Sequence, residues 1–197
     1  RFHPRRVAVV LLDGAITQGS SRKLPIDDEG LVGDETIIDA LDACRRDGGV
    51  GAVVLRVNSP GGSAVASDRI ARAVKRLRDA GKPVVVSFGD VAASGGYYVA
   101  APAHAIFAEP STLTGSIGVI AMKVDAAELL ERAGVNVETD RRGTHADMTG
   151  AHRAWTEEER QLMLARMRDT YELFLDTVAE GRKSRGFDRQ KVDRVGR

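Results

Sequence analysis

Short β-branched apolar runs alternate along this chain with segments whose apolar residues recur at helical spacing, and this alternation strongly constrains the fold. The predicted strands cover residues 7–12, 52–57, 84–88, 105–108, 118–122 and 135–139. The predicted helices cover residues 34–48, 64–80, 92–101, 126–133 and 157–183. Strands that alternate with helices predict an α/β fold with βαβ units, right-handed crossovers and a largely parallel sheet covered on both faces.

Local signals mark where two of these helices begin. Asp34 precedes a helical apolar pattern and is the expected N-cap of the second predicted element. Thr156 followed by Glu159 has the spacing of a capping box, which predicts the start of a long C-terminal helix. Residues 18–33 are polar and contain glycine, so we interpret them as a loop.

Composition excludes several classes of function. With 29 Lys and Arg against 28 Asp and Glu, the net charge is +1, so the broad basic field of a nucleic-acid binder is absent and no nucleic-acid partner is expected. The apolar runs are far shorter than the roughly 20 residues that cross a bilayer. Cys44 is the only cysteine, and the cysteine and histidines lack metal-ligand spacing, so no disulfide, metal or cofactor is expected. The chain begins at Arg1, not Met, and we expect residues 1–197 to form a single lobe of a longer protein.

Two glycine-rich segments follow predicted strands and are candidates for chemistry. The first is Ser59-Pro60-Gly61-Gly62 and the second is Ser94-Gly95-Gly96. In a parallel sheet, ligands bind at the carboxyl ends of the strands, so the two loops could meet there. Their amides could then face a developing oxyanion, and Ser94 could present its hydroxyl. The alternative is that both loops are ordinary turns and Ser94 is a helix N-cap.

Four segments in order resemble the signal peptide peptidase A family, also called protease IV. They are Val54-Leu55-Arg56-Val57-Asn58-Ser59-Pro60-Gly61-Gly62-Ser63, Gly81-Lys82-Pro83-Val84-Val85-Val86-Ser87, Ala92-Ala93-Ser94-Gly95-Gly96-Tyr97-Tyr98 and Pro110-Ser111-Thr112-Leu113-Thr114-Gly115-Ser116-Ile117-Gly118. The resemblance implies a fold of stacked ββα units like those of Clp protease and crotonase, and a serine–lysine catalytic dyad.

The resemblance also implies a role for individual residues. Ser94 matches the nucleophile, and the Gly61-Gly62 turn with the Gly95 amide matches the oxyanion hole. Ser116 matches the hydroxyl that orients the lysine. Of the two tyrosines after the nucleophile, we expect one to pack in the core and Tyr97 to line the substrate groove.

The sequence departs from this family at the general base. Single-lobe members carry a lysine where this chain has Ala146. Three explanations remain open. In the first, the chain is the C-terminal, serine-bearing lobe of the double-length form, and another lobe supplies the lysine. In the second, the lysine of a single-lobe enzyme was replaced by alanine to trap it, and in the third, the lobe has lost activity. We favour the first. Lys123 and His145 are the alternative bases within the chain, and we give both little weight.

The resulting hypothesis is a serine endopeptidase lobe that cleaves signal peptides and other extended apolar peptides. A lysine-bearing lobe or neighbouring subunit completes the dyad, and the protein is expected to be a homo-oligomer. The resemblance places the intact enzyme at a bacterial cytoplasmic membrane, anchored by a segment outside this chain. The rival hypotheses are a crotonase-like acyl-CoA enzyme and an inactive peptide-binding or scaffold lobe.

Overall fold

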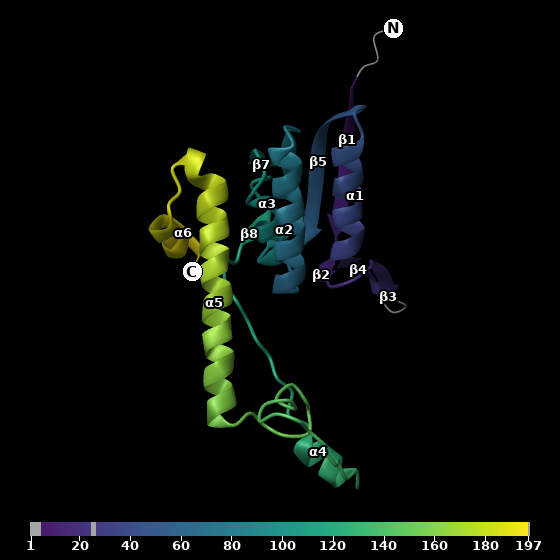
Figure 1. Cartoon of the computed structure of the whole chain (residues 1–197), viewed down its shortest axis with the longest axis vertical. Helices are drawn as coiled ribbons and strands as arrows, with labels where there is room; N and C mark the ends of the chain where they lie inside the picture. Colours follow the sequence, from purple (N-terminus) through teal and green to yellow (C-terminus); the bar gives the residue numbers. More distant parts are fainter. Residues whose placement is uncertain (1–4, 25–26, 197) are drawn as a thin grey trace. The chain divides into compact units, whose positions relative to one another are not determined.

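The computed structural model describes residues 5–24 and 27–196, which divide into two compact units (Figure 1). Unit 1 contains the described residues up to Gly118 together with those from Glu172 onward, and unit 2 is Val119–Tyr171. Each unit is described separately below.

Unit 1 is built on a parallel sheet in the order β1-β5-β6-β7, with β8 also pairing with β6. Its strands are β1 (Arg6–Asp13), β5 (Val50–Ser59), β6 (Val84–Ala93), β7 (Ala105–Phe107) and β8 (Leu113–Gly115). Every pairing in this sheet is parallel, as the alternation of strands and helices predicts. The α/β fold class is therefore confirmed.

Helices α1 (Asp34–Arg46) and α2 (Ala64–Asp79) lie along one face of this sheet, and the short helix α3 (Gly95–Ala100) follows β6 (Figure 1). The core fills the space between the sheet and these helices, and its most fully buried large side chains are Leu12, Leu41, Val53, Leu55, Val57, Ile70, Val74, Leu77, Val84, Val86 and Val99. On the other face of β1, Val7, Val9 and Leu11 are exposed. The prediction that both faces are covered is therefore wrong for this strand.

A second, smaller sheet replaces most of the loop that we predicted for residues 18–33. It contains β2 (Ala15–Thr17), β3 (Arg22–Leu24) and β4 (Asp27–Gly33), with β4 in the centre. The pairing of β2 with β4 aligns Ile16 with Val32, and both side chains are buried. Because only the end of β4 is apolar, its sequence does not have the alternation by which strands are recognised.

Helix α1 begins at Asp34 itself, with Gly33 as its N-cap, so the predicted capping role of Asp34 is wrong by one residue. The Asp34 carboxylate is fully buried, accepts a hydrogen bond from the Gly19 amide at 2.8 Å and pairs with Arg69 at 2.6 Å. At the other end, the Lys82 ammonium donates to the carbonyls that end the helix and to Val50 O at 3.0 Å. A cation is favourable at a helix C-terminus.

Unit 2 contains α4 (Ala127–Arg132) and the first part of α5 (Glu157–Arg182). The strands predicted at 118–122 and 135–139 are absent from the described structure. Ile120 and Met122 alternate as in a strand but are 94% and 86% exposed, and no neighbouring strand in the described part of the chain pairs with them. Residues 172–182 of α5, η1 (Lys183–Arg185) and α6 (Arg189–Gly196) belong to unit 1. The long C-terminal helix is thus confirmed.

Candidate active site

The two glycine-rich loops of unit 1 lie against each other. They follow β5 and β6, which pair in parallel with Ser59 opposite Ala92. A Cβ atom placed on Gly61 would lie 2.6 Å from the Gly95 nitrogen, and one placed on Gly95 would lie 3.3 Å from the Gly62 nitrogen. The backbones therefore approach so closely that a side chain would clash at Gly61.

Ser94 joins β6 to α3 in a backbone conformation that is unusual for a residue with a side chain. Its φ is 51° and its ψ is −118°, a region that costs of order 1–3 kcal/mol and is found mainly at functional sites. Its own N–H donates to the Gly115 carbonyl at 2.9 Å, which connects the turn to the end of β8. The half-buried side chain of Ser94 is thereby presented on a tightly held turn.

The capping alternative for Ser94 can be compared with a second serine in the same unit. Ser63 follows the first glycine-rich loop as the N-cap of α2, and its hydroxyl accepts a hydrogen bond from the Ala66 amide at 3.3 Å. Ser94 occupies the N-cap position of α3, but its side chain makes no capping hydrogen bond. The hydroxyl of Ser94 is therefore not used to stabilise the helix that follows it.

The amides of the two loops differ in what they bind. The Gly61 N–H donates to Ser59 Oγ at 3.1 Å, so it is already engaged. In the part of the chain that the structure describes, the N–H groups of Gly62 and Gly95 have no acceptor. Gly61 and Gly62 adopt φ values of 99° and 146°, which strongly favour glycine. Two unpaired amides beside a serine hydroxyl are the arrangement that stabilises an oxyanion.

Two buried serines, to which the sequence alone assigns no role of their own, support this geometry. Ser59 holds the turn through the hydrogen bond from Gly61 described above. Ser67 donates from its hydroxyl to the Ser63 carbonyl at 2.9 Å, and a Cβ on Gly95 would lie 2.4 Å from Ser67 Oγ. Neither serine stands out in sequence, because short polar residues near turns are common.

Ser116 and the two tyrosines lie in the same unit. Ser116 is exposed, has a φ of 49° and directly follows the Gly115 carbonyl that accepts from Ser94. Tyr98 is buried and its hydroxyl bonds to Asp68 and Thr177, while burial raises its pKa to about 12.

Tyr97 is half-buried and packs against Phe88 with ring centroids 6.2 Å apart. Burial raises the pKa of its phenol, and the charge of Arg182 lowers it to a smaller extent. Tyr98 is therefore the tyrosine that packs in the core, and the groove role of Tyr97 stays a prediction.

The alternative bases within the chain have partners of their own. In unit 2, Lys123 Nζ donates to the Met148 carbonyl at 2.6 Å and lies 5.7 Å from the centre of the Trp155 ring. His145 lies 3.4 Å from a carboxylate oxygen of Glu158, and its neighbour Ala146 is exposed.

The lysines of unit 1 differ in how far they are engaged. Lys75 Nζ pairs with Glu180 at 2.6 Å, and Lys82 binds the carbonyls at the end of α1. Lys191 donates to the Gly186 carbonyl, and Lys183 is exposed. In the sequence, Lys82 follows an amphipathic helix, where we expect a solvated charge, but this expectation is wrong because backbone carbonyls bind its ammonium.

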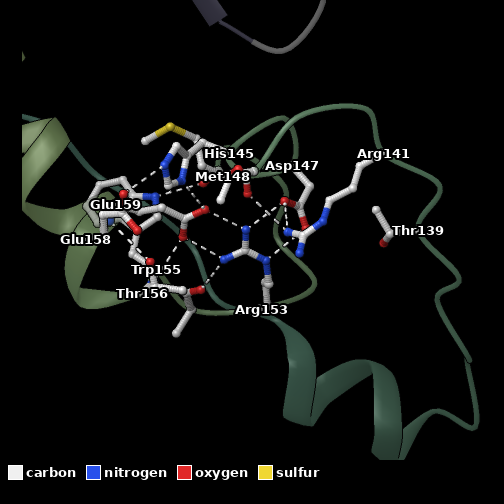
Figure 2. A network of polar contacts seen from close by, with 12 residues as sticks. Thr139, Arg141, His145, Asp147, Met148, Arg153, Trp155, Thr156, Glu158 and Glu159 are labelled. Carbon is white, nitrogen blue, oxygen red and sulfur yellow. Dashed lines mark hydrogen bonds and ion pairs between the residues drawn. The ribbon is translucent and has the colours of Figure 1, made fainter.

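Unit 2 also contains a dense ion-pair network centred on Arg153 (Figure 2). Its guanidinium donates to both oxygens of Asp147 at 2.7–2.9 Å and to both oxygens of Glu159 at 2.7 Å. Glu159 and Thr156 form the predicted capping box, with reciprocal bonds of 2.9 and 3.2 Å. Arg153 holds the pKa of Asp147 well below its usual range and, together with the Thr156 amide, lowers that of Glu159 to about 2.

The described residues contain no group of three or more His, Cys, Asp and Glu side chains that could hold a metal ion. Among the described helices, none combines the length and apolar character of a membrane span.

Comparison with solved structures shows the fold to which this arrangement belongs. A ClpP1 mutant from Listeria monocytogenes matches with a TM-score of 0.55 and 16% identity, over 95% of this chain and 78% of that one. A membrane-bound stomatin-specific protease mutant matches with a TM-score of 0.54 and 15% identity, over 97% of this chain and 69% of that one. The expected Clp-protease-like fold is therefore confirmed.

Sequence comparison gives relatives with higher sequence identity than these two structures. A chloroplastic serine protease SPPA from Arabidopsis thaliana is 40% identical over 90% of this chain, and Protease 4 from Salmonella typhi is 40% identical over 90%. The chain spans only 26% and 28% of those two proteins. The family model described as "Peptidase family S49" matches residues 76–194, which is more than half of the chain. The resemblance to signal peptide peptidase A is thus confirmed, and the chain belongs to peptidase family S49.

Proposed function

We propose that this chain is the serine-bearing lobe of a signal peptide peptidase, with Ser94 as its nucleophile and a lysine from another lobe or subunit as its base. The conformation of Ser94 carries this proposal: a non-glycine residue at positive φ, with a hydroxyl that caps nothing, lies against the Gly61-Gly62 turn. Strain of this kind persists where the surrounding structure holds a functional side chain in place.

The proposed reaction follows from these groups. Ser94 Oγ attacks the scissile carbonyl while a neutral, desolvated lysine accepts the hydroxyl proton. The N–H groups of Gly62 and Gly95 stabilise the negative oxygen of the tetrahedral intermediate. The lysine then donates the proton to the leaving amine, and water hydrolyses the acyl-enzyme by the same route. Ser116 is proposed to orient the lysine, and Gly61 contributes the shape of the turn because its amide is bound to Ser59.

The contacts of the lysines within this chain support a general base that comes from another lobe or subunit. Lys75, Lys82 and Lys123 bind other groups of the chain. The family resemblance also implies that Ala146 stands where single-lobe members carry the lysine. The relatives are also about four times as long as the matched segment, which leaves room for a lysine-bearing lobe. We therefore propose that activity requires assembly of lobes or subunits.

The substrates and location are proposed on the same basis. The relatives are named Protease 4 and SPPA, and we infer that the substrates are signal peptides and other extended apolar peptides. We propose that the intact protein is a homo-oligomer at a bacterial cytoplasmic membrane, with its anchor outside residues 1–197. Tyr97 is proposed to line the groove that receives the peptide.

Labelling with a serine-directed fluorophosphonate tests this function. The chain and the longer protein that contains it are each compared with their Ser94→Ala forms. Ser63→Ala is the matched control, because Ser63 follows the other glycine loop and its hydroxyl caps a helix and accepts from Gln18. We expect labelling of the longer protein, abolished by Ser94→Ala and retained by Ser63→Ala. Labelling of the isolated chain would show that it contains its own base. If neither protein is labelled, the lobe is inactive.

A further inference from the structure

The strand that leads to Ser94 contains a bulge. β5 and β6 are aligned with Val57 opposite Phe88, but two residues later Ser59 lies opposite Ala92. Three residues of β6, 89–91, therefore occupy the space opposite the single residue Asn58. A bulge bends its strand and redirects the side chains that follow it. This one ends three residues before Ser94.

The side chain of Asn58 spans this bulge. Its Oδ1 accepts a hydrogen bond from the Val91 amide at 3.2 Å, and its Nδ2 donates to Asp13 Oδ1 at 2.9 Å. The backbone carbonyl of Asn58 accepts from the Gly14 amide at 2.9 Å. One residue thus connects the carboxyl ends of β1, β5 and β6.

The bulge is shaped to receive this carboxamide. A Cβ atom on Gly89 would lie 2.8 Å from Asn58 Oδ1 and 2.9 Å from its Cβ, so a side chain at position 89 would displace Asn58. From the other side, Thr112 Oγ1 donates to the Gly89 carbonyl at 2.9 Å and Thr114 Oγ1 donates to the Ala92 carbonyl at 2.8 Å. The part of β6 that precedes Ser94 is therefore held by side chains on both sides. Asn58 of β5 binds it on one side, and Thr112 and Thr114 bind it on the other.

We propose that Asn58 is a positioning residue for Ser94, which it places by holding the β6 bulge through the Val91 amide. The Val91 amide sets the orientation of the carboxamide, because a backbone N–H can only donate and therefore requires the oxygen end, while Asp13 accepts from the NH₂ end. Asn58 does not touch the reacting atoms in this proposal, which rests on the proposed role of Ser94.

The test exchanges the donor and the acceptor of the hydrogen bond between Asn58 and Asp13. Asn58→Asp keeps the size of the side chain but brings two carboxylates together at Asp13, which opposes the native arrangement. The double variant Asp13→Asn with Asn58→Asp restores one donor and one acceptor in reversed order. Asp13→Asn alone is the matched control, because the carboxamide oxygen that it introduces at position 13 can still accept from Asn58.

In the longer, lobe-complete protein, we expect Asn58→Asp to slow fluorophosphonate labelling and kcat by about 100-fold with little change in KM, since a displacement of about 1 Å can cost this much. The double variant is expected to recover most of the rate, and Asp13→Asn to remain near the original rate. If the unaltered protein is labelled and Asn58→Asp is labelled equally fast, the proposal is overturned. A slow Asn58→Asp that the exchange does not rescue also overturns it.

Amide hydrogen exchange on the chain gives a readout that does not depend on activity. We expect Asn58→Ala to accelerate exchange at the Val91 amide and at the Ser94 amide, which the bulge keeps bound to Gly115. Unchanged exchange at Ser94 would overturn the positioning role even if no protein were labelled. The two proposals can therefore fail separately. If the unaltered protein is not labelled but Asn58→Ala accelerates exchange at the Ser94 amide, the nucleophile role of Ser94 is rejected and the positioning role of Asn58 is supported.

Discussion

The Cβ atom of Ser94 lies 2.9 Å from the position that a Cβ atom on Gly61 would occupy. The turn after β5 and the turn after β6 are therefore packed backbone against backbone, and the serine lies where the two meet. Because β5 and β6 are neighbouring parallel strands, the sheet itself brings these turns together. The proposed site depends on this close approach of the two turns.

Replacing Gly61 with alanine is expected to disrupt this approach. The new Cβ would meet the Gly95 nitrogen at 2.6 Å and the Ala93 carbonyl oxygen at 2.9 Å, and both are backbone atoms that cannot move without shifting Ser94. We expect Gly61→Ala to reduce fluorophosphonate labelling of the lobe-complete protein by about 100-fold or more.

Gly81→Ala is the matched control for this substitution. Gly81 also has a positive φ, 79°, but a Cβ there would meet nothing within 4 Å. The Gly81→Ala variant therefore has the conformational strain of an alanine at positive φ, but no steric clash. Normal labelling of Gly61→Ala, or equal losses in the two variants, would contradict the importance of the close approach.

The strain at Ser94 predicts an unusual order of stability among its variants. Ser94→Ala keeps a Cβ at a φ of 51°, whereas Ser94→Gly removes the steric conflict. Relief of the strain exceeds the entropy that glycine adds to the unfolded chain, so we expect Ser94→Gly to be more stable than Ser94→Ala by about 1 kcal/mol. Urea denaturation followed by circular dichroism measures the difference. An alanine variant that is as stable as the glycine variant would show that the turn is not strained.

The sequence predicted the elements of unit 1 more accurately than those of unit 2. In unit 1, valine-rich runs such as 84–88 form strands because neighbouring strands and helices bury them. The run at 118–122 is also mostly apolar, but no strand in the described structure pairs with it. Apolar composition indicates which residues can form a strand, while pairing partners decide whether they do so.

The candidate site was predictable from sequence only where its chemistry lies in short local motifs. Small residues after apolar strands made Ser94 and the Gly61-Gly62 turn candidates, while the ordinary-turn alternative stayed open and the family resemblance supplied their expected roles. Asn58 does not stand out, because its function depends on the register between β5 and β6, which no local pattern specifies. The unpaired state of the Gly62 amide and the engagement of the Gly61 amide likewise emerge only from the hydrogen bonds of the described residues.

The end of α5 is expected to be important for the stability of unit 1. Arg182 is 8% exposed and donates to the Ala101 carbonyl at 2.8 and 3.1 Å and to the Ala103 carbonyl, while burial lowers the pKa of its guanidinium. Arg182→Met leaves these carbonyls without their donor, so we expect a loss of about 1–3 kcal/mol in the free energy of unfolding, measured with urea.

Lys183→Met is the matched control for Arg182, since it removes a neighbouring positive charge from an exposed position. It is expected to change the stability by less than about 0.5 kcal/mol. Equal effects of the two substitutions would indicate that net charge, and not the carbonyl contacts of Arg182, determines the result.

The Arg153 network predicts how unit 2 responds to acid. Arg153 and the Thr156 amide lower the pKa of Glu159 from 4.5 to about 2, so the ionised form stabilises the folded state. This stabilisation is complete above the unfolded pKa and is lost as the pH falls from about 4.5 toward about 2. Asp147, whose pKa Arg153 also lowers, adds to the same trend. We therefore expect unit 2 to lose stability in this range.

Trp155 provides the measurement, because it is the only tryptophan and its indole donates to the Met148 carbonyl at 2.7 Å within unit 2. Urea titrations followed by its fluorescence at several pH values should show a weaker pH dependence for Glu159→Gln than for the unaltered chain, with lower stability at neutral pH. Glu158→Gln is the control, because its carboxylate is 73% exposed and should leave the dependence unchanged. If Glu159→Gln keeps the full dependence, the acid response arises outside the contact between Glu159 and Arg153.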